Sequence, residues 1–320
     1  MRKCPLAVCT AGVLILLCGC QNLSHLFGGE LKEVMVERSP RWFEPNRIVI
    51  VDVQGFLSSS QGGLFSLSET TVADVKEKLN RAGADRSVKA VILRIDSPGG
   101  EVTASDVMCE EVRAFREESG KPVVACLMGV AASGGYYVAL AADRIVASPT
   151  AVTGSVGVIT RYTNIEGLYN KVGLRSVVIK SGAKKDMGSG TRTLTQEERQ
   201  ILEGINRSLF ERFAKAVRVG RLQMTDEDFS AISDGRVVTA DQALKLHMVD
   251  SIGYLEDALA QARSLAGIGG AHVIIYRPFP HYNANIYASM AGQHDVLGQM
   301  FKLLLERRGP TFLYLWSPGL

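Results

Sequence analysis

Uninterrupted apolar runs, each followed by a glycine-containing turn and a helix-like segment, constrain the fold of this chain more than any other feature. The runs at 89–96 (KAVILRID) and 121–129 (KPVVACLMG) lack polar-apolar alternation. Such runs are typical of strands that are covered on both faces. Helical patterns follow them at 101–118 and 133–142. Strands that alternate with helices predict an α/β fold around a mostly parallel sheet.

Further elements are predicted on either side of these units. The turn SPGG at 97–100 is expected to break the first strand. Thr195 stands three residues before Glu198, which is the spacing of a capping box at the start of a long helix with Ile201, Ile205, Leu209 and Phe213 on one face. The other predicted elements are a strand at 47–58, a helix at about 69–82, a β-rich stretch at 144–159, a strand at 175–182, and two helices within 239–266.

The first twenty residues read as an export signal. A basic start, Arg2 and Lys3, precedes an uncharged run at 5–18. About 14 apolar residues are fewer than the roughly 20 that a membrane-spanning helix needs, so a cleavable signal is favoured over an uncleaved anchor. The ending LCGC resembles a bacterial lipobox. This resemblance implies that Cys20 carries a lipid and anchors the protein in the bacterial cell envelope, facing away from the cytoplasm.

Charge and cysteine usage narrow the function classes. The formal net charge is only +3, which gives no reason to expect a nucleic-acid partner. Four of the six cysteines lie in the export signal, and the remaining two, Cys109 and Cys126, fall in a predicted helix and a predicted strand. They are expected to be buried thiols without a disulfide, and their spacing does not indicate a metal site.

Ser133 stands where a predicted strand passes into a predicted helix. The N–H group of Gly134 at that helix start lacks an intrahelical acceptor. The SPGG turn at 97–100 supplies a second strand-to-helix turn, and turns at the ends of adjacent parallel strands converge on one crevice. At this point two interpretations fit Ser133, a nucleophile and a helix cap. Tight turns alone are likewise enough to explain the glycines.

A general base for such a serine is better supplied by lysine than by histidine. The five histidines have no helpful context, and a surface or packing role explains each of them. Lys180, Lys184 and Lys185 lie on a glycine-rich segment that could fold over a crevice. A desolvated, neutral lysine amine can accept a proton. A solvated basic loop is the alternative interpretation.

Five segments in order resemble the signal peptide peptidase A family of serine proteases, in its short single-domain form. The similarity runs from about residue 47 to residue 262. It implies the Clp protease/crotonase fold, a spiral of ββα units with mostly parallel sheets, and a serine/lysine dyad without histidine. The five segments are DSPGG (96–100), AASGGYYVALAAD (131–143), TGSVGVI (153–159), KSGAKKDMGSGTRTLTQEER (180–199) and DGRVVTADQALKLHMVD (234–250).

The resemblance also implies roles for particular residues. Lys184 stands where the family usually has an aromatic residue, so both Lys184 and Lys185 stay candidates for the base. A second ammonium close by would favour the neutral form of its neighbour. The implied roles are Ser133 as nucleophile, Lys185 as general base, Ser155 as the residue that orients the lysine, and the N–H groups of Gly100 and Gly134 as oxyanion donors.

The resemblance finally implies an organisation and a set of partners. We expect a linker at 21–46, a protease domain at 47–270, and a tail at 271–320 that packs on the domain or on another subunit. A ring- or dome-shaped homo-oligomer is implied, with remnant signal peptides and other apolar peptides as substrates and with no metal or cofactor. A crotonase-like acyl-CoA enzyme and a non-catalytic envelope scaffold are the competing hypotheses.

Overall fold

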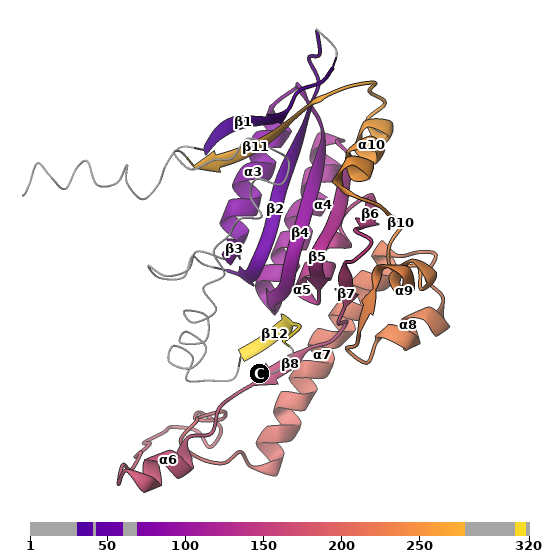
Figure 1. The fold of residues 1–320 in the computed structure, drawn as a ribbon. Helices are drawn as coiled ribbons and strands as arrows, with labels where there is room; N and C mark the ends of the chain where they lie inside the picture. The colour runs from indigo at the N-terminus through magenta and orange to yellow at the C-terminus, as the bar shows by residue number, and fades with distance from the viewer. Residues whose placement is uncertain (1–30, 41–42, 60–68, 279–310, 318–320) are drawn as a thin grey trace, which may run out of the picture.

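The fold is built on one mixed sheet with parallel strands at its centre. The computed structural model describes residues 31–40, 43–59, 69–278 and 311–317. The central strand order is β1-β11-β2-β4-β5-β6-β10, and all neighbours in this path are parallel except β1 and β11 (Figure 1). These strands are β1 (Leu31–Glu37), β2 (Arg47–Ser58), β4 (Val88–Glu101), β5 (Val123–Ala132), β6 (Arg144–Ala147), β10 (Ser251–Ile252) and β11 (His272–Pro278).

Helices cover both faces of the sheet, which explains the uninterrupted apolar runs. On β4, Val91 and Leu93 pack into one hydrophobic cluster, and Ile92 packs into the other. Successive side chains of a strand point to opposite faces, so a strand between two helical layers must be apolar at every position. The first cluster includes α3 (Val72–Ala84), α4 (Val102–Ser119) and α5 (Gly134–Ala139), and the second includes α10 (Leu255–Leu265). The predicted α/β class is confirmed.

The far end of β5 leads into a second set of strands. Residues 124–127 of β5 pair with β6, whereas residues 130–132 pair with β7 (Val152–Gly154). β7 in turn pairs antiparallel with β9 (Val237–Thr239). β3 (Glu69–Thr71) pairs with the end of β2, and the short helices α8 (Asp226–Ile232) and α9 (Ala240–Lys245) flank β9.

An arm projects from the sheet between β7 and the end of the long helix α7 (Figure 1). It contains β8 (Ile159–Arg161), α6 (Glu166–Lys171), the loop that carries the predicted lysines, and α7 (Gln196–Gly220). The predicted capping box is confirmed, since Thr195 N–H donates to Glu198 Oε2 (2.9 Å) and Glu198 N–H donates to Thr195 Oγ1 (3.2 Å). Phe213 is fully buried in the core, and it anchors the arm there.

Two local predictions are wrong. The segment 175–182 forms no strand, and Val177 and Ile179 are 85% and 97% exposed. A strand needs a paired neighbour, and the described part of the arm offers none to this segment. The SPGG turn does not end its strand either, because β4 continues through Gly100 to Glu101. Pairing with β2 on one side and β12 (Thr311–Leu315) on the other maintains the extended backbone there.

The sheet extends past both ends of the predicted protease domain at 47–270. β1 lies in the segment expected to be a linker, and β11 and β12 lie in the segment expected to be a tail. β11 inserts between β1 and β2, and its side chains Val273, Ile274 and Ile275 are buried. An apolar strand in that position covers the edge of β2, which would otherwise expose unpaired backbone groups.

No helix within the described residues is both long and apolar enough to cross a bilayer. The predicted export signal, including Cys20, lies outside the described residues.

Both core cysteines should be unreactive in the folded protein. Cys109 and Cys126 are free, buried thiols, as predicted, and burial raises the pKa of each to about 12. The thiolate is the reactive form, so alkylation by iodoacetamide at pH 8 should be negligible at both sites until the chain unfolds. Peptide mass mapping after native and denatured labelling measures this, with the denatured sample as the control. Rapid native labelling of either residue would contradict the burial.

Candidate active site

Ser133 carries a free hydroxyl on a strained turn. It follows β5 with φ 52° and ψ −114°, a backbone conformation that residues with a side chain rarely adopt. Its N–H donates to the Gly154 carbonyl (2.7 Å), and its carbonyl accepts from Tyr137 N–H (2.8 Å). The side chain is fully buried and caps nothing, and Ser133 Oγ has no hydrogen-bond partner in the described part of the chain. Ser133 therefore occupies the N-cap position of α5, but its side chain does not act as the cap.

The SPGG segment of β4 lies against the serine turn, as the parallel topology predicted. Ser97 Oγ donates to the Gly55 carbonyl (2.6 Å) and accepts from Gly99 N–H (3.0 Å), so it fixes the shape of the turn. Gly99 has φ +102°, and a Cβ placed on it would lie 2.7 Å from Gly134 N. Only glycine permits this approach of two backbones.

The two glycines predicted as oxyanion donors are both closely packed. A Cβ on Gly134 would overlap Ser105 Oγ and would lie 3.1 Å from Gly99 Cα. A Cβ on Gly100 would overlap the backbone of Leu57 on β2. Gly134 therefore packs directly against Gly99, whereas Gly100 packs against β2.

Ser155 is brought close to the nucleophile candidate by the β5–β7 pairing. It directly follows Gly154, whose carbonyl accepts from Ser133 N–H. Ser155 is buried, has φ 53°, and donates its N–H to the Arg236 carbonyl (2.7 Å). The structure therefore joins the ASGG and TGSVG segments, although they are twenty residues apart in the sequence.

The three candidate lysines lie on the arm and not beside Ser133. Lys180 pairs with Asp186 (2.5 Å), and Lys184 pairs with Glu197. Lys185 is exposed, and no ion pair or side-chain hydrogen bond joins it to the described residues. Since Ser133 Oγ is unbonded, a single chain does not assemble the predicted dyad.

An ion cluster fixes the loop that carries these lysines. Arg192 donates to Asp186 Oδ1 (2.8 Å) and to Glu198 Oε1 (2.6 Å), so it joins the loop to the first turn of α7. Arg192 and then Lys180 hold the pKa of Asp186 well below its usual range. Arg192 and the Thr195 N–H likewise lower the pKa of Glu198 to about 2.

A second polar network lies next to the serine turn, and no sequence pattern predicted it. Tyr137 donates its hydroxyl to Asp106 (2.7 Å), and Arg212 of α7 pairs with the same carboxylate (2.7 Å). Burial opposes ionisation of Asp106, but the hydrogen bonds from Arg212 and Tyr137 lower its pKa overall. The network therefore ties α4, α5 and the base of the arm together.

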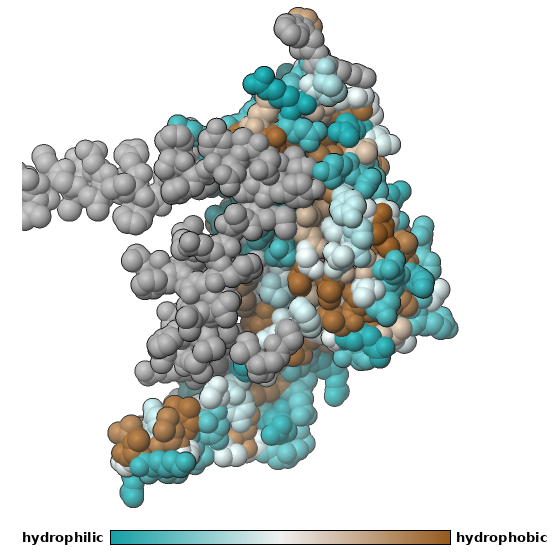
Figure 2. All heavy atoms as spheres, in the orientation of Figure 1, coloured by the Kyte–Doolittle hydropathy of each residue, from teal (hydrophilic) through white to brown (hydrophobic). Residues whose placement is uncertain are grey.

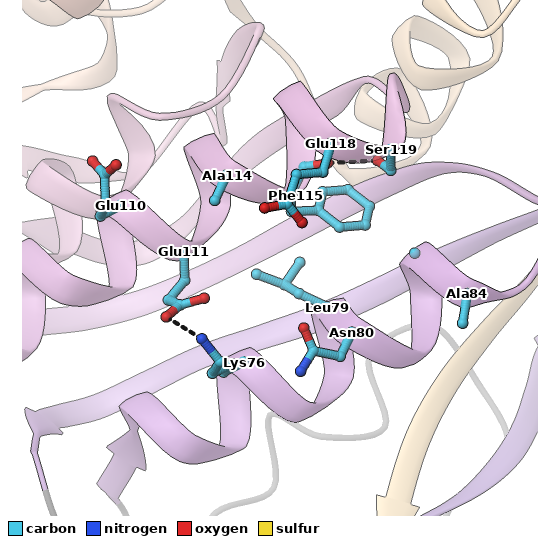
Figure 3. A pocket seen from close by; sticks show the side chains of 11 residues that line it. Lys76, Leu79, Asn80, Ala84, Glu110, Glu111, Ala114, Phe115, Glu118 and Ser119 are labelled. Atoms are coloured by element: carbon cyan, nitrogen blue, oxygen red, sulfur yellow. Dashed lines mark hydrogen bonds and ion pairs between the residues drawn. The ribbon is translucent and has the colours of Figure 1, made fainter.

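The groove between α3 and α4 is a separate feature. It has a volume of about 580 Å³, and Figure 3 shows Leu79 and Phe115 in it together with the ion pair between Lys76 and Glu111 (2.6 Å). None of its lining residues is a candidate for the catalytic chemistry. This groove is therefore distinct from the candidate active site around Ser133.

Comparison with known proteins agrees with the fold. Residues 115–269 match the model of peptidase family S49, and residues 64–153 match that of Clp protease. The chain is 31% identical to a proposed signal peptide peptidase, SppA, of Enterococcus faecium over 80% of this chain and 74% of that protein. It is 35% identical to Protease 4 of Salmonella typhi over 70% of this chain, although it spans only 35% of that relative's length.

A solved structure, a mutant of ClpP1 from Listeria monocytogenes, aligns with 67% of this chain at 16% identity and a TM-score of 0.42. The family matches and the mostly parallel sheet confirm the predicted Clp protease/crotonase fold. The molecule is a serine-type peptidase. It belongs to peptidase family S49.

Adding one methyl group at Gly134 should disable the site. In Gly134→Ala the new Cβ would overlap Ser105 Oγ and press on Gly99, so we expect peptide hydrolysis to fall about 100-fold and stability to fall by about 1–3 kcal/mol. Gly204→Ala is the matched control, because a Cβ there has open space and alanine favours the helix. Peptidase assays and thermal unfolding measure both. Equal behaviour of the two variants would contradict the packing described here.

The loop that carries the lysines should detach only in acid. The pKa of Glu198 is about 2 in the folded chain against an ordinary 4.5. The Arg192 contacts therefore stabilise the loop fully above about pH 4.5, and this stabilisation is lost as the pH falls toward 2. Hydrogen exchange of residues 180–198 at pH 7, 5 and 3, corrected for the intrinsic exchange rate, should show a loss of protection only at pH 3. Arg192→Met should lose protection already at pH 7.

Proposed function

We propose that the protein is a membrane-tethered serine endopeptidase that uses a Ser133/Lys185 dyad. The observation that carries this proposal is the buried, unbonded Ser133 Oγ at the meeting point of two glycine turns. A hydroxyl in that position is costly for a folded chain unless a partner or a substrate uses it. Membership of a serine peptidase family favours this function over the acyl-CoA enzyme and over the scaffold.

The proposed mechanism is acyl transfer. The neutral amine of Lys185 takes the proton of Ser133 Oγ as that oxygen attacks the peptide carbonyl carbon. The N–H groups of Gly134 and Gly100 hold the oxyanion of the tetrahedral intermediate. The protonated lysine then donates its proton to the leaving amine, and a water molecule activated by the same lysine releases the acyl-enzyme.

We propose that the dyad forms between subunits of a ring- or dome-shaped homo-oligomer. Lys185 lies on a projecting arm without contact to Ser133 of its own chain, and much of the surface of the arm is apolar (Figure 2). Exposed apolar patches of this kind are typical of protein interfaces. The exposed large apolar residues of the arm are Ile159, Leu168, Val172, Leu174, Val177, Val178, Ile179, Ile201, Ile205 and Val219.

Assembly also explains how one lysine becomes a base. Covering the arm with a neighbouring subunit removes water from the amine and favours its neutral form. Lys184 is already paired with Glu197, whereas Lys185 forms no ion pair among the described residues, so Lys185 is the preferred base. We assign to Ser155, which is buried next to the Ser133 turn, the role of accepting a hydrogen bond from the incoming lysine.

We propose remnant signal peptides and other apolar, extended peptides as substrates. The support is the similarity to the Enterococcus relative, which is named for that activity. A lipid on Cys20 would keep the enzyme at the surface of an envelope membrane, facing away from the cytoplasm, where such peptides are released. The mechanism requires no metal and no cofactor.

Complementation between inactive chains tests the proposed dyad. Ser133→Ala and Lys185→Ala should each lower hydrolysis of an apolar peptide by about 10³-fold or more, because each removes a reacting group, whereas Lys184→Ala should retain most activity. Co-assembled Ser133→Ala and Lys185→Ala chains should recover part of the activity, since some sites combine an intact serine with an intact lysine. Full activity of Lys185→Ala would contradict the assignment of the base. Failure of co-assembled chains to recover activity would contradict a dyad between subunits.

A further inference from the structure

The groove between α3 and α4 combines an apolar floor with an acidic rim. Leu79 of α3 and Phe115 of α4 form the floor, and the groove around them has a volume of about 580 Å³ (Figure 3). Three of the residues that line it are glutamates of α4, and one is a lysine of α3. A surface of this kind is complementary to a segment that carries both apolar and basic side chains.

The acidic charge of the rim is only partly neutralised. Lys76 pairs with Glu111 (2.6 Å), and Arg113 approaches Glu110 at a distance of 3.7 Å. Glu118 is exposed, and it forms no ion pair with any residue that the structure describes. Glu118 therefore presents a free carboxylate on the rim, near the C-terminal end of α4.

The end of the arm carries the complementary side chains. Residues 166–185 contain five basic residues and one acidic residue, which gives a net charge of +4. Lys171 and Arg175 are exposed and form no ion pair within the described part of the chain. Val177 and Ile179 follow them directly, and both of these apolar side chains are exposed. The charge and the hydropathy of this segment therefore both match the groove.

The helix α4 leads from the serine turn to the groove. Ser105, in the first turn of α4, lies against Gly134, because a Cβ on Gly134 would overlap Ser105 Oγ. Glu118 follows 13 residues later on the same helix, which is about 20 Å at a rise of 1.5 Å per residue. The ten residues from Arg175 to Lys185 span at most about 33 Å, since an extended chain covers about 3.3 Å per residue. One arm is therefore long enough to place Arg175 in the groove and Lys185 beside the serine turn.

We propose that the groove between α3 and α4 of one subunit receives the end of the arm of a neighbouring subunit, and that this contact sets Lys185 beside Ser133. Arg175 then pairs with Glu118, and the exposed apolar side chains of the arm cover the floor of the groove. This inference rests on the proposed function, in which the dyad forms between subunits. It adds the surface that receives the arm.

Charge reversal and its rescue test the contact in the full-length protein. Glu118→Lys should raise the concentration at which half of the chains are assembled by about tenfold, because it brings like charges together. Adding Arg175→Glu to the same chain should restore assembly, since the pair then forms with its charges exchanged. Glu117→Lys is the matched control, because Glu117 is exposed on α4 but does not line the groove. Analytical ultracentrifugation measures assembly, and hydrolysis of an apolar peptide is assayed in the same samples.

A cross-link between chains locates the arm directly. Glu118→Cys chains that are co-assembled with Val177→Cys chains should form a disulfide between the two positions under mild oxidation. The natural core cysteines are buried and do not compete. Glu117→Cys chains, treated in the same way, should give at least about tenfold less of this product. Peptide mass mapping identifies the linked residues.

The outcomes separate this inference from the proposed function. Equal assembly of the wild type and Glu118→Lys, without the cross-link, would overturn the groove contact. If co-assembled Ser133→Ala and Lys185→Ala chains still recover activity, the dyad between subunits stands, and only the receiving surface is wrong. If the cross-link forms but those co-assembled chains stay inactive, the dyad between subunits fails, and the placement of Lys185 beside Ser133 fails with it.

Discussion

The close approach of the β4 backbone at Gly99 to the backbone turn that follows β5 is the constraint on which the rest of this molecule depends. Gly99 follows the apolar part of β4, Gly134 follows β5, and no side chain fits between them. Parallel pairing of β4 and β5 brings the two glycines to the same edge of the sheet. Ser133 directly precedes Gly134, has a strained backbone with φ 52°, and its buried Oγ has no hydrogen-bond partner in the described chain.

The arm differs from the closely packed junction around Ser133 in how it is held in place. Its loop is fixed by an ion cluster around Arg192, but it buries little apolar surface in a single chain, and Ile179 is almost fully exposed. A segment that is well ordered by charge and yet apolar on its surface suits a contact with another copy of the chain. The rigid serine junction and the projecting lysine loop are thus two halves of one proposed site.

Much of the central fold could be predicted from the sequence. The apolar runs of β4 and β5, the helices after them, the capping box at Thr195 and the buried thiols of Cys109 and Cys126 all depend on neighbours close in the sequence. The strand predicted at 175–182 does not form, because β-branched residues favour a strand only where a neighbouring strand can pair with them. The strands β1 and β11 were missed because pairing across more than two hundred residues leaves no local pattern.

The sequence by itself determined the class of fold, the serine, and the glycines that surround it, since these follow from strand and helix periodicity, from turn chemistry and from ordered motifs. Only the tertiary structure decided that the candidate lysines stand apart from Ser133 in one chain, and that α4 leads from the serine turn to an acidic groove. The physical reason is that hydrogen-bond pairing and side-chain packing between distant segments depend on how the sheet and the arm are arranged in space. The order of residues along the chain does not record that arrangement.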